Sequence, residues 1–282
     1  MANENSLDSE QARYWNEGGG RRWAANIARV ERMLQPLADR VLALAAPERG
    51  ERVIDVGCGG GLTSKALADA VGASGEVMGL DVSTVILDVA RQRYRDVFQL
   101  RFVHGDAGSM PFAHNLYSLV TSRFGVMFFP DSHGAFAHLR TALAPDGRLA
   151  FICWRELALN PWMAVPVKAA FEILPRPEPL APRAPGPFAF AERDYLYDIL
   201  STAGFAQIEI TAHDQSLDLG TVSDAVEQMT RMGPSAPAYD EATPAVRAQV
   251  VAALIEVFRP FVTNGTVQMA SATWLVRATR GA

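Results

Sequence analysis

A glycine-rich stretch at residues 53–61, Val-Ile-Asp-Val-Gly-Cys-Gly-Gly-Gly, constrains the fold of this chain more than any other feature. Glycine has no Cβ, so such a loop can turn sharply and lets a ligand approach its backbone. The apolar residues 52–56 before the loop predict a strand, and residues 62–71 after it predict a helix. The loop therefore lies at the carboxyl end of a strand, which is where open α/β sheets bind ligands.

Apolar strands and helical segments alternate after this loop. We expect further strands at residues 76–81, 101–104, 117–122 and 148–154, with helices between them. Ser83 is suited to cap the helix that follows the second strand. Pro145-Asp146-Gly147 is a turn signal directly before the strand at 148–154. This alternation indicates an α/β fold with a parallel sheet and helices on both faces.

The outer parts of the chain suggest additions to this core. Residues 24–46 have helical periodicity, and Gly18-Gly19-Gly20 separates them from the aromatic stretch before them. Prolines crowd residues 175–187 and predict an irregular connection. We expect a helix at 192–203, a strand at 205–211, mostly helices over 221–263 and a last strand at 271–279. The predicted units are an N-terminal helical segment that closes the ligand site (1–48), a core (49–155), a cap (156–190) and the rest of the core (191–282) with a helical insertion (213–265).

Composition excludes several classes of function. The chain has 282 residues, 49% of them hydrophobic, with a net charge of −5 and no dense basic stripe, so we expect no nucleic-acid partner. No apolar run approaches the roughly 18–20 residues that span a membrane, and the polar start predicts no secretory signal. The two cysteines have no metal-ligand spacing, so we expect no metal and a cytoplasmic location.

The register of the glycines narrows the choice of ligand. A dinucleotide loop needs Gly-x-Gly-x-x-Gly, and counting from Gly57 places Leu62 where the third glycine belongs. No Gly-Lys-Ser/Thr follows, so a phosphate-binding P-loop is also excluded. Asp55 ends the strand on the same face as Gly57, where its carboxylate would repel a pyrophosphate and favour an ammonium group. S-adenosylmethionine (SAM) carries an ammonium group and no phosphate.

Two more acidic residues follow the next strands. Asp81 ends the second strand, where a carboxylate can accept from both ribose hydroxyls, although dinucleotide sites place an acid similarly. Asp106 follows the third strand in the stretch Gly-Asp-Ala-Gly-Ser-Met-Pro-Phe (105–112) and can accept from the exocyclic amine of adenine. The alternatives are a helix cap for Asp81 and a turn acid for Asp106.

Together these motifs resemble a class I SAM-dependent methyltransferase of the UbiE-like group (methyltransferase domain 11/25), whose members act on small molecules. The resemblance implies a Rossmann-like, seven-stranded, mostly parallel sheet in the order 3-2-1-4-5-7-6 with strand seven antiparallel. It implies SAM as cofactor and S-adenosylhomocysteine as product. It also implies these cofactor contacts: Asp55, Gly57, Cys58, Gly59 and Gly61 for the methionine part, Asp81 and Val82 for the ribose, Asp106 and Ala107 for adenine, Ser122 near the sulfonium, and Tyr14 and Trp23 over the site.

The residues around the methyl acceptor are predicted less directly. Methyl transfer from a sulfonium needs alignment and exclusion of water, and a base only if the acceptor must lose a proton. None of the five histidines has a carboxylate partner at fixed spacing, and His133 is placed best by topology. Arg123 would hold a substrate carboxylate or phosphate, or else form a structural ion pair. The expected substrate contacts are Phe124, Trp154, Arg155 and Trp162.

The predicted function is transfer of a methyl group from SAM to a small, partly aromatic or hydrophobic metabolite by in-line displacement. Two alternatives stay open at this stage. One is a nicotinamide-dependent oxidoreductase, and the other is a SAM-binding protein with non-methylating chemistry. The sequence favours neither a monomer nor a homodimer.

Overall fold

The computed structural model describes residue 7 and residues 9–281. Within them, the sheet has eight strands in the order β3-β2-β1-β4-β5-β8-β6, with β7 paired only to β8. The strands are β1 (Arg52–Val56), β2 (Glu76–Asp81), β3 (Leu100–His104), β4 (Tyr117–Arg123), β5 (Leu143–Trp154), β6 (Ala206–Asp218), β7 (Val262–Thr263) and β8 (Thr266–Thr279). β1 to β5 run parallel, and β8 is antiparallel to β5 and β6. The expected fold class and strand order are confirmed, with β8 in the seventh position.

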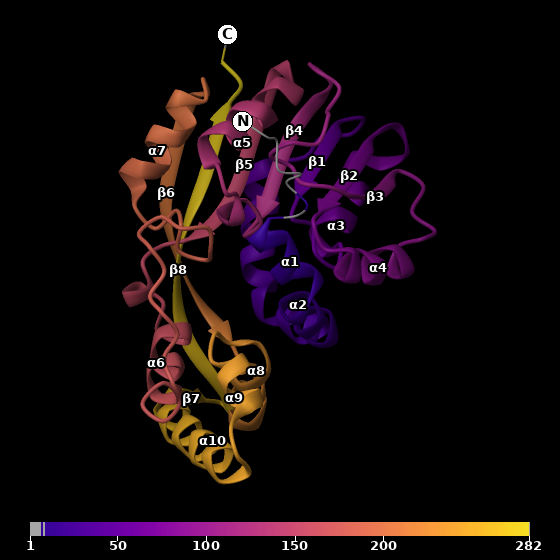
Figure 1. The fold of residues 1–282 in the computed structure, drawn as a ribbon. Helices are drawn as coiled ribbons and strands as arrows, with labels where there is room; N and C mark the ends of the chain where they lie inside the picture. Colours follow the sequence, from indigo (N-terminus) through magenta and orange to yellow (C-terminus); the bar gives the residue numbers. More distant parts are fainter. Residues whose placement is uncertain (1–6, 8, 282) are drawn as a thin grey trace.

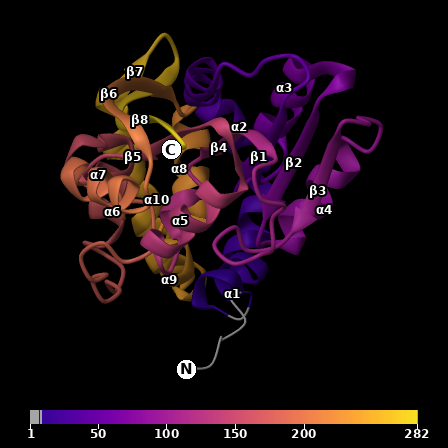
Figure 2. The same cartoon turned by 90° about the horizontal axis from the view of Figure 1, so that it is seen from above.

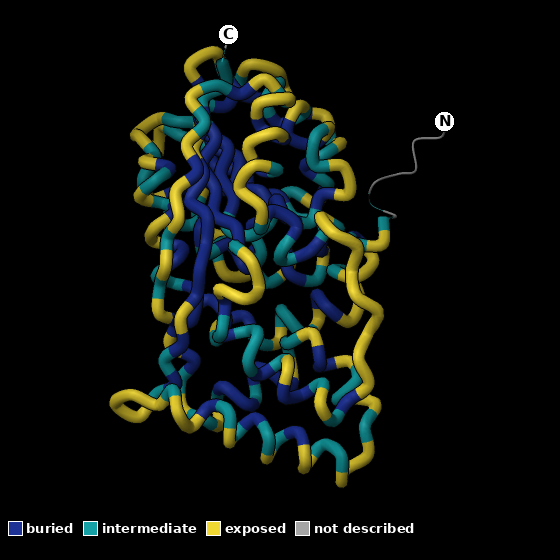
Figure 3. The backbone as a smooth tube through the Cα atoms, turned by 90° about the vertical axis from the view of Figure 1, so that its left-hand side faces the viewer, coloured by how far each residue is buried: buried dark blue, intermediate teal, exposed yellow. Residues whose placement is uncertain are grey.

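Helices cover both faces of this sheet (Figures 1 and 2). The α-helices of the described residues, including those beyond one end of the sheet, are α1 (Glu10–Asn16), α2 (Gly18–Ala45), α3 (Leu62–Val71), α4 (Thr84–Arg93), α5 (Ser132–Ala142), α6 (Pro161–Ala170), α7 (Arg193–Thr202), α8 (Val222–Met232), α9 (Ala236–Glu241) and α10 (Pro244–Phe258). Val53 and Ile54 on β1 are both fully buried, although they point to opposite faces. Figure 3 shows buried, dark-blue strands in the upper part of the molecule.

A helical lobe, consisting of α6, α8, α9, α10 and β7, lies beyond one end of the sheet (Figure 1). It is carried by β6 and β8, because their pairing continues from Thr273 to Gln268 after the pairing of β8 with β5 has ended at Trp154. The prediction that residues 213–265 form a helical insertion is therefore partly wrong. Its first residues, up to Asp218, are strand, and the helices begin at Val222.

The three glycines at 18–20 belong to a helix, in contrast to the sequence-based expectation. They form the first turn of α2, which begins at Gly18 and not at residue 24. A Cβ on Gly20 would come within 1.7 Å of the Trp15 carbonyl oxygen, and one on Gly19 within 2.4 Å of the Tyr14 ring. Glycine is needed here for close packing of α1 against α2, which outweighs its low helix propensity.

The expected turn at Pro145-Asp146-Gly147 lies inside β5. Tyr117 pairs with Leu143 and Leu119 pairs with Arg148, and the shift in register between these pairs takes up the three turn residues. β5 therefore begins at Leu143 and not at residue 148, because the Pro-Asp-Gly sequence forms an irregularity within the strand. No helix in the described part of the chain is long and apolar enough to cross a membrane.

Candidate functional site

A cavity of about 600 Å³ opens at the carboxyl ends of the parallel strands. Its walls come from the sheet, from α1 and α2, from the proline-rich segment before α7, and from α6 and α8 of the helical lobe. Most of the lining side chains are apolar or aromatic. Cavities of this size and character bind small molecules in many proteins.

The glycine loop forms one wall of the cavity. Gly57 and Gly59 line it with positive φ angles of 65° and 54°. A Cβ on Gly57 would lie 2.6 Å from the Gly125 Cα, so the loop can pass the end of β4 only without a side chain. Gly61 is the N-cap of α3 and lies outside the lining, and a Cβ there would meet the Phe102 ring at 2.7 Å. Gly61 therefore serves packing against β3.

Asp55 lies buried beneath the loop and does not line the cavity. Its Oδ2 accepts hydrogen bonds from the hydroxyls of Thr63 (2.8 Å) and Ser64 (2.6 Å), while its Oδ1 has no partner in the described residues. Burial raises the pKa of Asp55 to about 6, against the opposing effects of these hydroxyls and of Arg123. The loop thus rests on an acidic group, which disfavours a phosphate ligand.

Asp81 and Val82 line the cavity at the end of β2. The Asp81 carboxylate accepts from the backbone N–H groups of Gly59 and Ser83, both at 2.9 Å. Burial raises the pKa of Asp81, and these hydrogen bonds oppose the shift. The Ser83 hydroxyl accepts from the Ile86 N–H and caps α4 as predicted, so Asp81 is not the helix cap. Its carboxylate is held at the cavity wall with lone pairs still available to a ligand.

Asp106 and Ala107 line the cavity after β3. Asp106 Oδ1 accepts from the Gly108 N–H at 2.8 Å, so the residue also stabilises its own turn. The two roles expected for this acid, turn and ligand contact, are compatible, since a carboxylate can accept several hydrogen bonds.

The N-terminal helices cover the opposite wall. Tyr14 and Trp23 both line the cavity, as does Trp15, whose ring meets those of Trp23 (5.8 Å) and Phe128 (5.3 Å) edge to face. Asn16 fixes α1 to α4, because its amide donates to the Val82 carbonyl (2.7 Å) and its oxygen accepts from the Thr84 N–H (2.9 Å).

Arg123 and three aromatic residues form the part of the wall at β4 and β5. The Phe124 ring stacks on Trp154 at 4.2 Å with an interplanar angle of 7°, and Trp154 lies 5.1 Å from Trp162. Phe124 has a positive φ of 65°, a conformation that aims its ring at Trp154 and that non-glycine residues rarely adopt. All four residues line the cavity.

The Arg123 guanidinium has no ion-pair partner among the described residues, and its Nε is buried without a hydrogen-bond acceptor. Burial lowers the pKa of Arg123, while the charges of Asp55 and Glu31 act in the opposite direction. The alternative of a structural ion pair, left open by the sequence, therefore has no support in this structure. A cation without a partner in an apolar cavity is a strong attractor for an anionic ligand group.

Four other predicted site residues lie outside the cavity lining. His133 contacts Asp198 (3.3 Å) and Tyr195 on α7. Arg155 pairs with Asp214 (3.0 Å) and lies over the Trp274 ring. The Ser122 hydroxyl donates to the Val56 carbonyl (2.8 Å), and burial raises the pKa of the Cys58 thiol far above its ordinary value. In this structure, all four act in packing or in contacts between elements.

Residues on α2 and α8 were missed by sequence reasoning. Met33 and Leu34 line the cavity from α2, and Gln228, Met229 and Met232 line it from α8. A signal was present in the sequence of α8, where Gln228 interrupts an apolar stripe at helical spacing. A polar residue within such a stripe indicates a candidate functional position, but the sequence alone does not show that α8 packs against α2.

The wall at β1, β2 and β3 fits SAM on three observations. The glycine loop leaves room for close approach, the Asp81 carboxylate faces the cavity, and the buried Oδ1 of Asp55 beneath the loop has no partner in the described residues. An acidic group beneath the loop suits a ligand that carries an ammonium group and no phosphate. A carboxylate that can accept from hydroxyls, together with apolar walls, suits a nucleoside.

Comparison with known proteins agrees with this geometry. Residues 53–147 match a family model described as a methyltransferase domain. The demethylmenaquinone methyltransferase of Bacillus licheniformis is 34% identical over 111 residues, which are 39% of this chain and 48% of that protein. The chain thus spans about half the length of the curated relatives it matches.

Solved structures share the fold over most of the chain. The YcgJ protein of Bacillus subtilis is 17% identical with a TM-score of 0.59, covering 88% of this chain and 99% of that one. Phosphoethanolamine N-methyltransferase 2 of Haemonchus contortus, solved with SAM, is 15% identical with a TM-score of 0.61, covering 97% and 60%.

The fold, the glycine loop and the acidic residues at the cavity define a class I SAM-dependent methyltransferase domain. Over the matched region the chain is similar to the demethylmenaquinone methyltransferases, which agrees with the UbiE-like resemblance seen in the sequence, and the Haemonchus contortus neighbour was solved with SAM. These relatives and neighbours favour neither the nicotinamide-dependent alternative nor the non-methylating one.

Proposed function

We propose that the protein transfers a methyl group from SAM to a small, mainly aromatic or apolar metabolite that carries an anionic group. The unpaired Arg123 cation in the aromatic part of the cavity is the observation that carries this proposal. A buried guanidinium without an ion-pair partner gains most from a carboxylate or phosphate, which it can bind through two parallel hydrogen bonds.

The proposed roles of the cavity residues follow their positions along the sheet. Gly57, Gly59 and Asp81 at β1 and β2 hold the cofactor, with Asp106 and Ala107 beside its base. Bound SAM supplies an electrophilic methyl group on its sulfonium. Phe124, Trp154 and Trp162 at the other end offer ring faces to the substrate. Arg123, on β4 next to β1, lies between the two halves of the site.

The chain's contribution to the reaction is alignment and exclusion of water. Trp15, Trp23 and Phe128 close the cavity from the side of the N-terminal helices. No histidine lines the cavity among the described residues, so we expect no histidine to act as a general base in the reaction. The Arg123 cation would favour an anionic form of the substrate.

The partner is expected to be a small molecule and not nucleic acid, which agrees with the apolar cavity and the net charge of −5. A cytoplasmic location stays an expectation from the sequence.

Turnover of SAM against a panel of aromatic and aliphatic acids tests the proposal. We expect S-adenosylhomocysteine to form with at least one acid and not with the matching alcohol. Arg123→Gln should lower kcat/KM by about a hundredfold, as expected for a lost charge-assisted contact of roughly 3 kcal/mol, with little change in S-adenosylhomocysteine affinity. Binding of NAD without binding of SAM, measured by calorimetry, would refute it.

A further inference from the structure

Gln228 on α8 is a buried polar side chain that the cofactor does not explain. It is 4% exposed and lines the cavity among Met33, Met229 and Met232. Its Nε2 contacts the Met33 sulfur at 2.9 Å, and its Oε1 is buried without a partner in the described residues. A thioether sulfur is an acceptor, so the amide nitrogen belongs beside it and the carbonyl oxygen is the atom left over.

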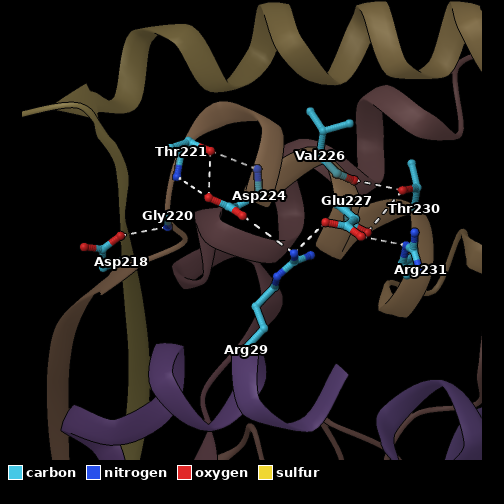
Figure 4. A network of polar contacts seen from close by, with 9 residues as sticks. All are labelled: Arg29, Asp218, Gly220, Thr221, Asp224, Val226, Glu227, Thr230 and Arg231. Carbon is cyan, nitrogen blue, oxygen red and sulfur yellow. Dashed lines mark hydrogen bonds and ion pairs between the residues drawn. The ribbon is translucent and has the colours of Figure 1, made fainter. Parts of the chain in front are cut away.

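The position of Gln228 is fixed by polar contacts one helical turn away. Arg29 on α2 pairs with Asp224 and Glu227 on α8, and Asp224 also completes the capping box with Thr221 (Figure 4). Arg29 and Met33 share one face of α2, and Asp224 and Gln228 share one face of α8, because each pair is four residues apart. The ion pairs thus set the rotation of α8 that keeps Gln228 against Met33.

An acceptor left unpaired in an apolar wall is unfavourable for the free protein. A buried carbonyl without a donor destabilises a fold by about 1–3 kcal/mol, and a ligand that donates to it recovers this energy. Methionine at this position would fill the same volume without that disadvantage. The same wall already consists of methionines, so the amide is the one group there that can discriminate between ligands by hydrogen bonding.

We propose that Gln228 Oε1 selects substrates that carry a hydroxyl or N–H donor in addition to the anionic group that Arg123 binds. The proposal rests on the proposed function and sharpens its substrate class: a flat, mainly apolar acid with a hydrogen-bond donor separated from the acid by an apolar body. Arg123 on β4 binds the anionic group of the substrate, and Gln228 in the helical lobe accepts a hydrogen bond from its donor.

Three probes that share the same charge and the same flat cinnamate body test the selection: 4-hydroxycinnamate, which carries a donor, cinnamate, which has no para substituent, and 4-methoxycinnamate, which carries an ether oxygen but no donor. Binding to the protein saturated with S-adenosylhomocysteine is measured by calorimetry. We expect the hydroxy acid to bind about tenfold more tightly than the other two, as one satisfied buried acceptor predicts. In Gln228→Met this preference should fall to about one, and cinnamate should bind as in the wild type. The control Gln35→Met, on an α2 glutamine outside the cavity lining, should keep the preference.

Thermal unfolding without ligands gives a second readout. Gln228→Met should melt at the wild-type temperature or above it, because the unpaired oxygen is removed. A lower melting temperature would show that the amide serves the fold and would overturn the proposal. So would equal affinities for the three probes in the wild type, a preference that survives in Gln228→Met, or no binding of 4-hydroxycinnamate. In each of those cases, retained S-adenosylhomocysteine binding and turnover of another acid would leave the proposed function intact.

Discussion

At the scale of single residues, Asp55 shows how a binding site can work against stability. The ordinary pKa of an aspartate is 3.8, and burial raises that of Asp55 to about 6 in the folded protein. Between about pH 4 and pH 6 the folded chain therefore binds more protons than the unfolded chain, and this group's contribution to stability falls as the pH rises. Above pH 6 the lost stability amounts to about 3 kcal/mol.

Asp55→Asn should remove this dependence on pH. Without cofactor, the variant should be more stable than the wild type at pH 7.5, by up to about 3 kcal/mol, and its advantage should shrink at pH 4.5. Asparagine can still accept from Thr63 and Ser64, so the comparison isolates the charge. Urea unfolding at the two pH values measures the difference. An advantage of equal size at both would contradict the raised pKa.

At the scale of elements, the loop between β1 and α3 offers a matched pair of glycines. Gly57→Ala must adopt a positive φ and also place a Cβ 2.6 Å from the Gly125 Cα, where backbone cannot yield. Gly59→Ala has the same conformational cost of about 1 kcal/mol, but its Cβ would have only the Trp23 Nε1 within contact, at 3.9 Å.

Gly57→Ala should therefore lose several kcal/mol of stability, lowering Tm by more than 10 °C, together with S-adenosylhomocysteine binding. Gly59→Ala should lose only a few degrees. Scanning calorimetry with and without S-adenosylhomocysteine compares them. Similar melting temperatures for the two variants would show that contact with β4 does not set the shape of the loop.

The elements also differ in how far short stretches of sequence determine them. β1, β2, α3 and the Ser83 cap lie where the sequence predicts them, because strand alternation, helical spacing and capping act over a few residues. Gly18-Gly19-Gly20 and Pro145-Asp146-Gly147 were misjudged, because close packing on α1 and pairing with β4 override local preference. Gln228 was missed because its role depends on α2, far away in the sequence.

At the scale of the whole molecule, the site depends on the contact between α2 and the helical lobe. Arg29 forms one link, since it joins α2 to Asp224 and Glu227 on α8, and Arg22 forms another with Asp240 on α9. Arg29→Ala should loosen α8, so that its backbone amides exchange about three- to tenfold faster, as the loss of roughly 1 kcal/mol predicts. Affinity for S-adenosylhomocysteine should stay unchanged, because Asp81 and the glycine loop lie on the other wall.

Hydrogen exchange followed by mass spectrometry measures this effect. The matched control is Arg231→Ala, which removes a second arginine that pairs with Glu227 but is largely exposed on α8 itself. It should leave exchange in α8 near the wild-type rate. If amide exchange in α8 were accelerated equally in both variants, the loss of any ion pair of Glu227 would explain the effect, and the ion pairs between Arg29 and α8 would have no special role.

The extension of β6 and β8 past the rest of the sheet has an evolutionary consequence. The Leu219 N–H donates to the Val267 carbonyl at 3.0 Å, and the Val267 N–H donates to the Gly220 carbonyl at 2.7 Å, so the chain leaves this ladder and returns to it at neighbouring rungs. Segment 221–266 is thus a long loop between two paired strands, and the entropy of closing such a loop grows only slowly with its length. Recombination that exchanges this module for a shorter turn or a different bundle would leave the wall formed by Gly57, Gly59 and Asp81 unaltered. Proteins that descend from one ancestor would then differ in the helical wall of the cavity and share the glycine loop.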